Sequence, residues 1–193
     1  MKKIPVAPKP ELAYRLLGVD PGTNVLGFAV LEVRNRQLKL IELDVLHLSA
    51  KLSHHERLGR IFETIQKVID EFRPTEMAIE APFFGKNVQS MLKLGRAQGV
   101  AIAAGLTRGL SIAEYPPKRI KQSVTGNGNA AKEQVAAMLG HILQLDLSGQ
   151  ILDATDALAA AVCHYYSTNS PGGGSKKYSG WGDFLKDNPD RSK

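Results

Sequence analysis

Residues 16–27 read L-L-G-V-D-P-G-T-N-V-L-G, and this stretch sets the expectations for the rest of the chain. A short apolar run ends on one acid, Asp20, and the proline after it biases Asp20 toward extended geometry. We therefore expect Asp20 at the carboxyl end of a buried strand, with Pro21 and Gly22 turning the chain into a second strand. A charged side chain at the tip of a core strand is costly unless it is paired or binds a cation. The groups that gather around Asp20 should therefore indicate the function.

Three strands with short connections are predicted at the start of the chain, over residues 14–19, 27–33 and 37–48. Consecutive strands joined by tight turns form an antiparallel meander. A helix should follow, because Ser53 and Glu56 fit a capping box and apolar residues then recur at helical spacing up to Arg73 and Pro74. The next predicted strand also ends on an acid, Glu80. The helix-length connection before it indicates a parallel crossover.

Four further elements are predicted, a helix over 87–106, a strand over 111–115, and helices over 131–145 and 153–166. The helix over 87–106 is rich in glycine and alanine. Small residues let another backbone approach closely, which fits packing against the chain's own sheet and a subunit interface equally well. Between the last strand and the next helix, the loop T-G-N-G-N-A fits either a phosphate-binding turn or an ordinary one.

Length and composition predict one globular domain with a substantial core: 193 residues, 43% hydrophobic and 23% charged. We expect a folded domain over 14–168 between a flexible arm at 1–13 and a flexible tail at 169–193. No apolar run approaches the roughly 18 residues that span a bilayer, and the basic N-terminus lacks a signal-peptide core. A cytoplasmic location without a membrane partner is the expectation. The net charge of +6 permits a polyanionic partner without requiring one.

Acids stand at the ends of two predicted strands, and the last predicted helix begins with Asp153 and Asp156 on one face. The helix pair alone also fits the general preference for acids at helix N-termini. Clustered carboxylates repel one another and need neutralising cations, and hard oxygen ligands select Mg²⁺ or Mn²⁺ over zinc. Two such ions about 3.5–4 Å apart can support phosphodiester cleavage. With a basic surface, this pattern favours a metal-dependent nuclease.

Five segments in order resemble the RuvC family of bacterial Holliday junction resolvases. They are G-V-D-P-G-T at 18–23, I-E-A-P-F-F-G-K-N at 79–87, L-K-L-G-R-A-Q-G-V-A at 92–101, K-Q-S-V-T-G-N-G-N-A-A-K-E-Q-V at 121–135 and D-A-T-D-A-L-A at 153–159. The similarity covers roughly residues 15–167. It implies an α/β, ribonuclease H-like nuclease domain. Its five-stranded mixed sheet, an antiparallel meander plus two parallel strands, should be flanked by helices.

The resemblance also implies roles for individual residues. Asp20, Glu80, Asp153 and Asp156 should be the catalytic acids that bind magnesium, with two ions per site and Mn²⁺ able to substitute. Phe83 should stack on an unpaired base at the crossover, with Phe84 as the alternative. Lys121 and Lys132 should contact DNA. The adjacent candidates for DNA contacts are Lys86, Asn87 and Lys118.

The implied activity is paired, symmetric nicking of opposed strands of a four-way DNA junction by a homodimer, leaving 5′-phosphate and 3′-hydroxyl ends. The RuvA–RuvB branch-migration complex is the implied protein partner, and the bacterial cytoplasm, at the nucleoid, is the implied location. Two departures from the family pattern occur: Ala81-Pro82 replaces a glutamate or glutamine and a valine, and G-R-A-Q-G replaces G-Q-A-R-G. Neither is expected to touch the acids, so both bear on base preference.

Two other functions fit part of the pattern. The segment D-P-G-T-N-V-L-G also resembles the phosphate-binding turn of actin-like and sugar-kinase phosphotransferases. Such an enzyme should have a second phosphate loop and a second domain, for which this sequence has neither the motif nor the length. The third candidate is a non-catalytic DNA-binding or scaffold protein, against which the acids at the strand ends argue.

Overall fold

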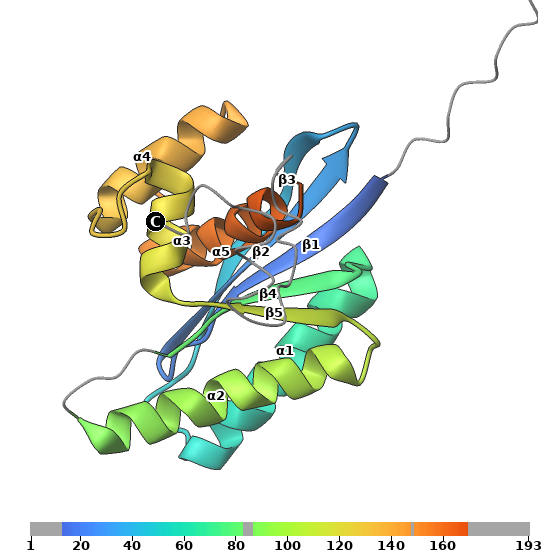
Figure 1. Cartoon of the computed structure of the whole chain (residues 1–193). Coiled ribbons are helices and arrows are strands. Elements are labelled where there is room, and N and C mark those ends of the chain that lie inside the picture. Colours follow the sequence, from blue (N-terminus) through green and yellow to red (C-terminus); the bar gives the residue numbers. More distant parts are fainter. Residues whose placement is uncertain (1–12, 83–86, 148, 170–193) are drawn as a thin grey trace, which may run out of the picture.

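A computed structural model describes residues 13–82, 87–147 and 149–169 (Figure 1). The regular elements begin at Ala13 and end at Asn169, one residue beyond each side of the predicted domain. Nearly all of the predicted arm and tail therefore lie outside the described residues. Within these ranges, no helix is long and apolar enough to cross a membrane.

A single five-stranded sheet forms the centre of the fold, with the strand order β3-β2-β1-β4-β5. Its strands are β1 (Ala13–Asp20), β2 (Val25–Arg34), β3 (Gln37–His47), β4 (Glu76–Glu80) and β5 (Ser111–Tyr115). The first three pair antiparallel, β4 pairs parallel with β1, and β5 pairs parallel with β4. The predicted mixed sheet is confirmed, including the parallel crossover after β3.

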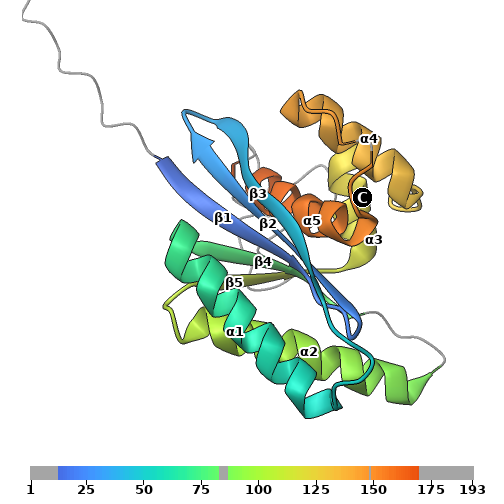
Figure 2. The same cartoon turned by 180° about the vertical axis from the view of Figure 1, so that it is seen from behind.

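Helices cover both faces of this sheet (Figures 1 and 2). They are α1 (His54–Phe72), α2 (Val88–Leu106), α3 (Pro117–Thr125), α4 (Lys132–Leu143) and α5 (Leu152–Asn169). The first two pack on one face, and α3, α4 and α5 pack on the other, so each face buries its own apolar core. This two-sided burial explains why the central parts of β1 and β2 read as nearly continuous apolar runs.

The ends of α1 follow the prediction closely. The backbone N–H of Glu56 donates to the Ser53 hydroxyl, and the Glu56 carboxylate accepts from the backbone N–H of Ser53. At the other end, Arg73 adopts left-handed geometry with φ 51° immediately before Pro74. Both ends of this helix are therefore fixed by residues that the sequence pattern identified.

The helix α3 was not predicted, and this is a correction to the expected element order. The pattern predicted only a basic run after Pro116 and Pro117, which end β5. Pro117 instead occupies the first turn of α3, where its missing N–H costs nothing because that group would be unpaired anyway. With nine residues and only Ile120 and Val124 buried, the helix is too short to give a clear periodic signal.

Side-chain alternation along two adjacent strands directs their terminal acids to the same face. In β1, Leu17 and Val19 enter the core under α1 and α2, whereas Leu16 enters the core under α5. Alternate residues of a strand point to opposite faces, so Asp20 shares the α5 face with Leu16. The same alternation through β4 brings Glu80 to that face, because Ala78 belongs to the core under α5.

A buried polar cluster joins α5 to the two parallel strands. His164 on α5 lies with Nδ1 2.7 Å from the Tyr115 hydroxyl at the end of β5. Its Nε2 lies 2.5 Å from a carboxylate oxygen of Glu76 at the start of β4. A carboxylate only accepts, so the Nε2 proton is donated to Glu76. These contacts fix α5 laterally across the sheet that carries the acids.

Candidate active site

Three of the four predicted acids form one tight group. Carboxylate oxygens of Asp20, Asp153 and Asp156 all lie within 4.8 Å of one another. Asp20 ends β1, and the two other acids occupy the first turns of α5. Oxygen ligands bind Mg²⁺ and Ca²⁺ at roughly 2.0–2.6 Å, so a single cation can bridge groups at this separation. The donor set consists only of hard oxygens, which fits a divalent cation of this class.

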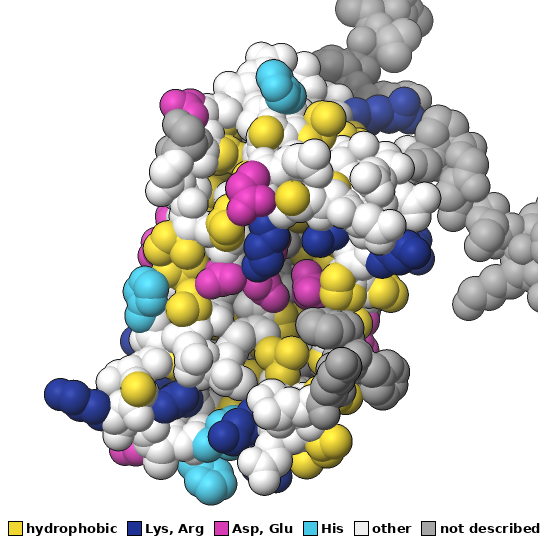
Figure 3. All heavy atoms as spheres, turned by 90° about the vertical axis from the view of Figure 1, so that its left-hand side faces the viewer, with side chains coloured by type: hydrophobic (Ala, Val, Ile, Leu, Met, Phe, Trp, Pro, Cys, Tyr) yellow, Lys and Arg dark blue, Asp and Glu magenta, His cyan; other side chains and the backbone are white. Residues whose placement is uncertain are grey.

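We call these three acids the acid triad. Glu80 is not one of them, but it lines a pocket together with Asp20 and Asp156. The parallel register pairs Val19 with Ile79, so Asp20 and Glu80 are the next residues along two adjacent strands. Both acids line a pocket of about 340 Å³ together with Asp156, Lys121 and Lys132. Figure 3 shows Asp and Glu side chains gathered at the centre of this face, with Lys and Arg side chains beside them.

The pocket strongly disfavours the charged forms of its two strand acids. Burial, followed by repulsion from Asp156, raises the pKa of Asp20 to about 7. Burial, followed by repulsion from Asp20, raises the pKa of Glu80 to about 8. Both carboxyls therefore bind protons at a pH where carboxyls in water are ionised. A bound cation would displace these protons by compensating the charge.

Lys132 supplies positive charge directly to the triad. Its ammonium forms an ion pair with Asp156 and lies 3.6 Å from a carboxylate oxygen of Asp153. Although burial alone would lower it, the pKa of Lys132 is raised because it donates to Asp156 and faces the other acids. The sequence predicted a DNA contact for this residue, and the structure places it over the acids at the start of α4.

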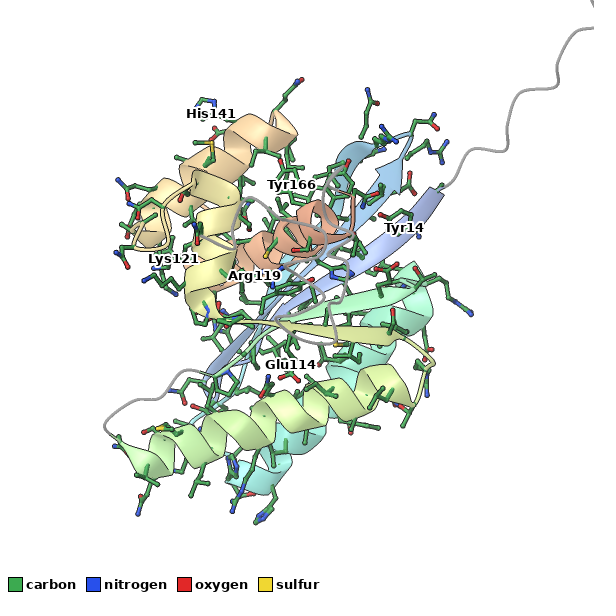
Figure 4. All side chains as sticks on the ribbon, viewed as in Figure 1. Tyr14, Glu114, Arg119, Lys121, His141 and Tyr166 are labelled. Atoms are coloured by element: carbon green, nitrogen blue, oxygen red, sulfur yellow. The ribbon has the colours of Figure 1, made fainter. Side chains whose placement is uncertain are left out.

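The second predicted DNA-contacting lysine also lines the pocket. Lys121 extends from α3, and its ammonium donates to the backbone oxygen of Ala130 at 2.8 Å (Figure 4). Lys118 is exposed on the same helix, and its side chain packs closely beside Gly128. Lys121 and Lys132 therefore lie at the acids, whereas Lys118 lies further out on α3.

The side-chain oxygen of Asn87 caps the start of α2. This residue precedes the first residue of α2, and its side-chain oxygen accepts from the backbone N–H of Ser90 at 3.0 Å. The predicted stacking residue Phe83, its alternative Phe84 and the candidate Lys86 lie outside the described residues. Ala81 and Pro82, which lead into that segment, line the acidic pocket.

The glycine-rich loop after α3 has the contacts of an ordinary turn. Gly126 adopts left-handed geometry with φ 76° and closes the helix by donating to the backbone oxygen of Gln122. The N–H groups of Asn127 and Asn129 donate to oxygens within the loop, and that of Ala130 donates to the Asn127 backbone. Since these N–H groups are already bonded, the structure favours the turn over a phosphate-binding loop.

Two glycines contribute to the site, although sequence reasoning assigned them no part in it. A Cβ atom built on Gly27 would lie 1.9 Å from the backbone oxygen of Asp153, and one on Gly18 would lie 2.1 Å from that of Ala157. The backbone of α5 therefore rests directly on β1 and β2. Gly27 is also the ladder partner of Asp20, so this close approach brings the α5 acids to the β1 acid.

Both departures from the family pattern lie nearer the acids than expected, which corrects that expectation. The Nε2 of Gln98 lies 3.5 Å from the backbone oxygen of Glu80 and donates to Glu114 at 2.7 Å. Glu114 extends from β5 toward α2 (Figure 4). Ala81 and Pro82 line the pocket itself. Position 98 is thus a buried contact behind Glu80, whereas Arg96 is exposed.

The mixed sheet and its acidic pocket define the class of the protein, a ribonuclease H-like fold with a group of acids suited to a divalent cation. A family model described as "Crossover junction endodeoxyribonuclease RuvC" matches residues 16–164. The chain therefore belongs to the RuvC family of crossover junction endodeoxyribonucleases, and the resemblance seen in its motifs is confirmed.

Individual relatives agree with this assignment. The protein of the same description from Cytophaga hutchinsonii is 57% identical over 178 residues, covering 92% of this chain and 88% of the relative. The one from Porphyromonas gingivalis is 54% identical over 182 residues, covering 91% and 95%. The structure of "T. thermophilus RuvC in complex with Holliday junction substrate" is 32% identical with a TM-score of 0.72, covering 80% and 95%.

Replacing Gly27 by alanine should weaken cation binding. The added methyl group cannot fit beside Asp153, so the start of α5 must move away from Asp20. We expect Mn²⁺ affinity, measured by calorimetric titration, to fall at least about tenfold, as it does when supports of metal ligands are removed. Gly59→Ala is the matched control, because nothing lies within 4 Å of a Cβ at that position. Unchanged Mn²⁺ affinity in the Gly27 variant would contradict this account of the site.

Cation binding should also depend on pH with a definite sign. Between about pH 4 and pH 7 the folded protein holds protons on Asp20 and Glu80 that the unfolded chain releases, so these groups cost the cation-free fold stability as the pH rises. A cation removes that cost. The increase in melting temperature on adding Mg²⁺ should therefore be larger near pH 8 than near pH 6. An equal increase at both pH values would count against cation binding at these carboxyls.

Proposed function

We propose that this protein is a Holliday junction resolvase, a metal-dependent endonuclease that nicks opposed strands of a four-way DNA junction. The observation that carries the proposal is that Asp20, Glu80 and Asp156 line one pocket with Lys121 and Lys132, while Asp153 lies beside Asp20 and Asp156. Membership of the RuvC family supports the choice of substrate, as does the likeness to a T. thermophilus protein solved with a Holliday junction.

The four acids are proposed to hold two Mg²⁺ ions, for which Mn²⁺ can substitute. Bound ions of this kind activate a water and stabilise the leaving oxygen in an in-line displacement. The acids at the ends of β1 and β4 and at the start of α5 would hold the ions, while Lys121 on α3 and Lys132 on α4 would attract and orient the phosphate. Cleavage on this scheme leaves 5′-phosphate and 3′-hydroxyl ends.

Further DNA contacts are proposed for the segment that follows β4. Phe83 comes three residues after Glu80, and its neighbours Ala81 and Pro82 line the pocket, so the segment starts at the acids. Stacking of an unpaired base on Phe83, or on Phe84, would contribute about 1–3 kcal/mol to binding. Lys86, Asn87 and Lys118 are proposed as supporting contacts.

Asp20→Asn should abolish nicking of a synthetic four-way junction in Mg²⁺ while junction binding persists. The change removes a ligand and one negative charge without changing the shape of the side chain. We expect a rate loss greater than the roughly 10–100-fold caused by removing outer-sphere partners of a metal. The assay compares the junction with a linear duplex of the same sequence and maps the nicks on a sequencing gel.

The results also separate the alternative functions. A wild-type protein that binds the junction but never nicks it in Mg²⁺ or Mn²⁺ would favour the non-catalytic DNA-binding alternative. Persistent nicking by the Asp20 variant would refute the role of the acids. ATP turnover without junction cleavage would revive the phosphotransferase.

A homodimer is part of the proposal, and the two faces of α2 support it. Ala97, Ala101 and Ala104 are buried against the chain's own core, so packing explains these small residues. A second face carries the exposed Val88, Leu92 and Leu106, at 66%, 59% and 59% exposure. Gly95 and Gly99 have open space where a Cβ would stand, which leaves room for the close approach of a second helix.

Leu92→Glu should therefore convert a dimer into monomers in light scattering, because a charge at the centre of an apolar contact is costly to bury. Leu145→Glu is the matched control, since Leu145 is also exposed but belongs to the segment after α4. A wild-type monomer at working concentration, or a Leu92 variant that remains dimeric, would contradict this interface.

Family membership extends the proposal to the protein's surroundings. The RuvA–RuvB branch-migration complex is the proposed protein partner, and the bacterial cytoplasm at the nucleoid is the proposed location. Both follow from the family alone.

A further inference from the structure

An uncompensated group of cations lies at the junction of α1 and α2. We name it the Lys93–Arg96 patch; it consists of Lys93 and Arg96 on α2 and lies beside His54 and His55 at the start of α1. Burial, followed by the positive charges of Arg96, His55, Lys93 and Arg57, lowers the pKa of His54, and no described carboxylate opposes this effect. Positive charge therefore accumulates here without an acid to balance it.

The two cations on α2 are unpaired within the part of the chain that the structure describes. Elsewhere, Arg15 pairs with Glu32 and Arg108 with Asp70, and both pairs are hydrogen-bonded. Lys93 and Arg96 are exposed and take part in no ion pair or hydrogen bond with a described residue. They stand three positions apart on one side of the helix, where like charges repel. An anion between them would remove that repulsion.

Arg57, near the start of α1, joins this end of α1 to the turn beside the acidic pocket. The Arg57 guanidinium donates to the backbone oxygen of Thr23 and to the Asn24 side chain, in the turn that follows Asp20. It also donates to the backbone oxygens of Ala50 and Leu52, so its hydrogen bonds are used to fix the turn against α1. Figure 3 shows Lys, Arg and His side chains on the same face as the acids, on the opposite side from the lysines over the pocket.

The order of residues in α2 leaves the positive charge of Arg96 exposed to solvent. Gln98 is buried against Glu114, while Arg96 is exposed. The arrangement R-A-Q thus directs a neutral amide inward and a guanidinium outward. Arg96 and Lys93 also lie to the side of the apolar face of Val88 and Leu92, because helix positions repeat every 3.6 residues. These cations therefore flank the proposed dimer contact.

We propose that Lys93 and Arg96 bind the phosphate backbone of a DNA arm that leaves the acidic pocket on the α1–α2 side. This deepens the proposed function and rests on it. The phosphate chain of DNA is the ligand class that fits two exposed cations beside a nuclease pocket when no described residue pairs with them. Together with Lys121 and Lys132 on the other side, the patch brackets the acids with two phosphate-binding surfaces.

The test is the salt dependence of junction binding by the full chain in EDTA, where the acids hold no cation. Each phosphate contact contributes about 0.9 to the logarithmic salt slope, so the double variant Lys93→Gln/Arg96→Gln should lower the slope by about 1.8. Between about 50 and 200 mM KCl, wild-type affinity should then fall about tenfold more than that of the variant. Lys39→Gln/Lys67→Gln is the matched control, because it removes the same charge from exposed sites on β3 and further along α1 that have no ion-pair partner in the described ranges.

A wild-type slope in the Lys93/Arg96 variant, or an equal reduction in both double variants, would overturn the proposal. So would a change in oligomeric state with an unchanged slope, because the cations would then serve the subunit contact. Nicking in Mg²⁺ is scored separately on the wild type. If the wild type binds the junction but does not nick it, the proposed function fails, while the slopes still decide the patch.

Discussion

Direct contact between backbones, with no side chain between them, is the constraint on which this structure depends. At Gly18 and Gly27 the last helix rests on β1 and β2 so closely that even a methyl group has no room. This approach brings the first turns of α5 over the end of β1, where Asp20 stands, and so creates the acid triad. A helix held off by side chains at these two positions would lie further from the sheet, and its acids would lie further from Asp20.

The same close approach brings together carboxylates whose negative charge the fold does not fully neutralise. Lys132 is the cation that contacts the triad among the described residues, and the raised pKa values of Asp20 and Glu80 reflect the remaining imbalance. Proteins commonly depart from local stability rules where they bind ligands. Here the imbalance and the all-oxygen donor set both fit a divalent cation, so the local cost to stability has a functional interpretation.

The acids and most elements could be predicted because their signals are local. Strand alternation directs Asp20 and Glu80 to one face, and the capping box fixes the start of α1. The position of Lys132 over the acids could not be predicted, because it depends on how the start of α4 meets the start of α5. The helix α3 was missed because prolines marked a strand end while also permitting a helix start. The roles of Gly18 and Gly27 depend on which backbone crosses them, which no local pattern encodes.

The partly buried contact between His164 and Glu76 has a consequence for strand pairing. Glu76 and Glu80 are the first and last residues of β4 and share a face, so one short strand carries both the anchor of α5 and an acid of the pocket. A slip of one residue would turn both carboxylates to the opposite face together. The contact between His164 and Glu76 therefore favours the strand register that also directs Glu80 toward the other acids.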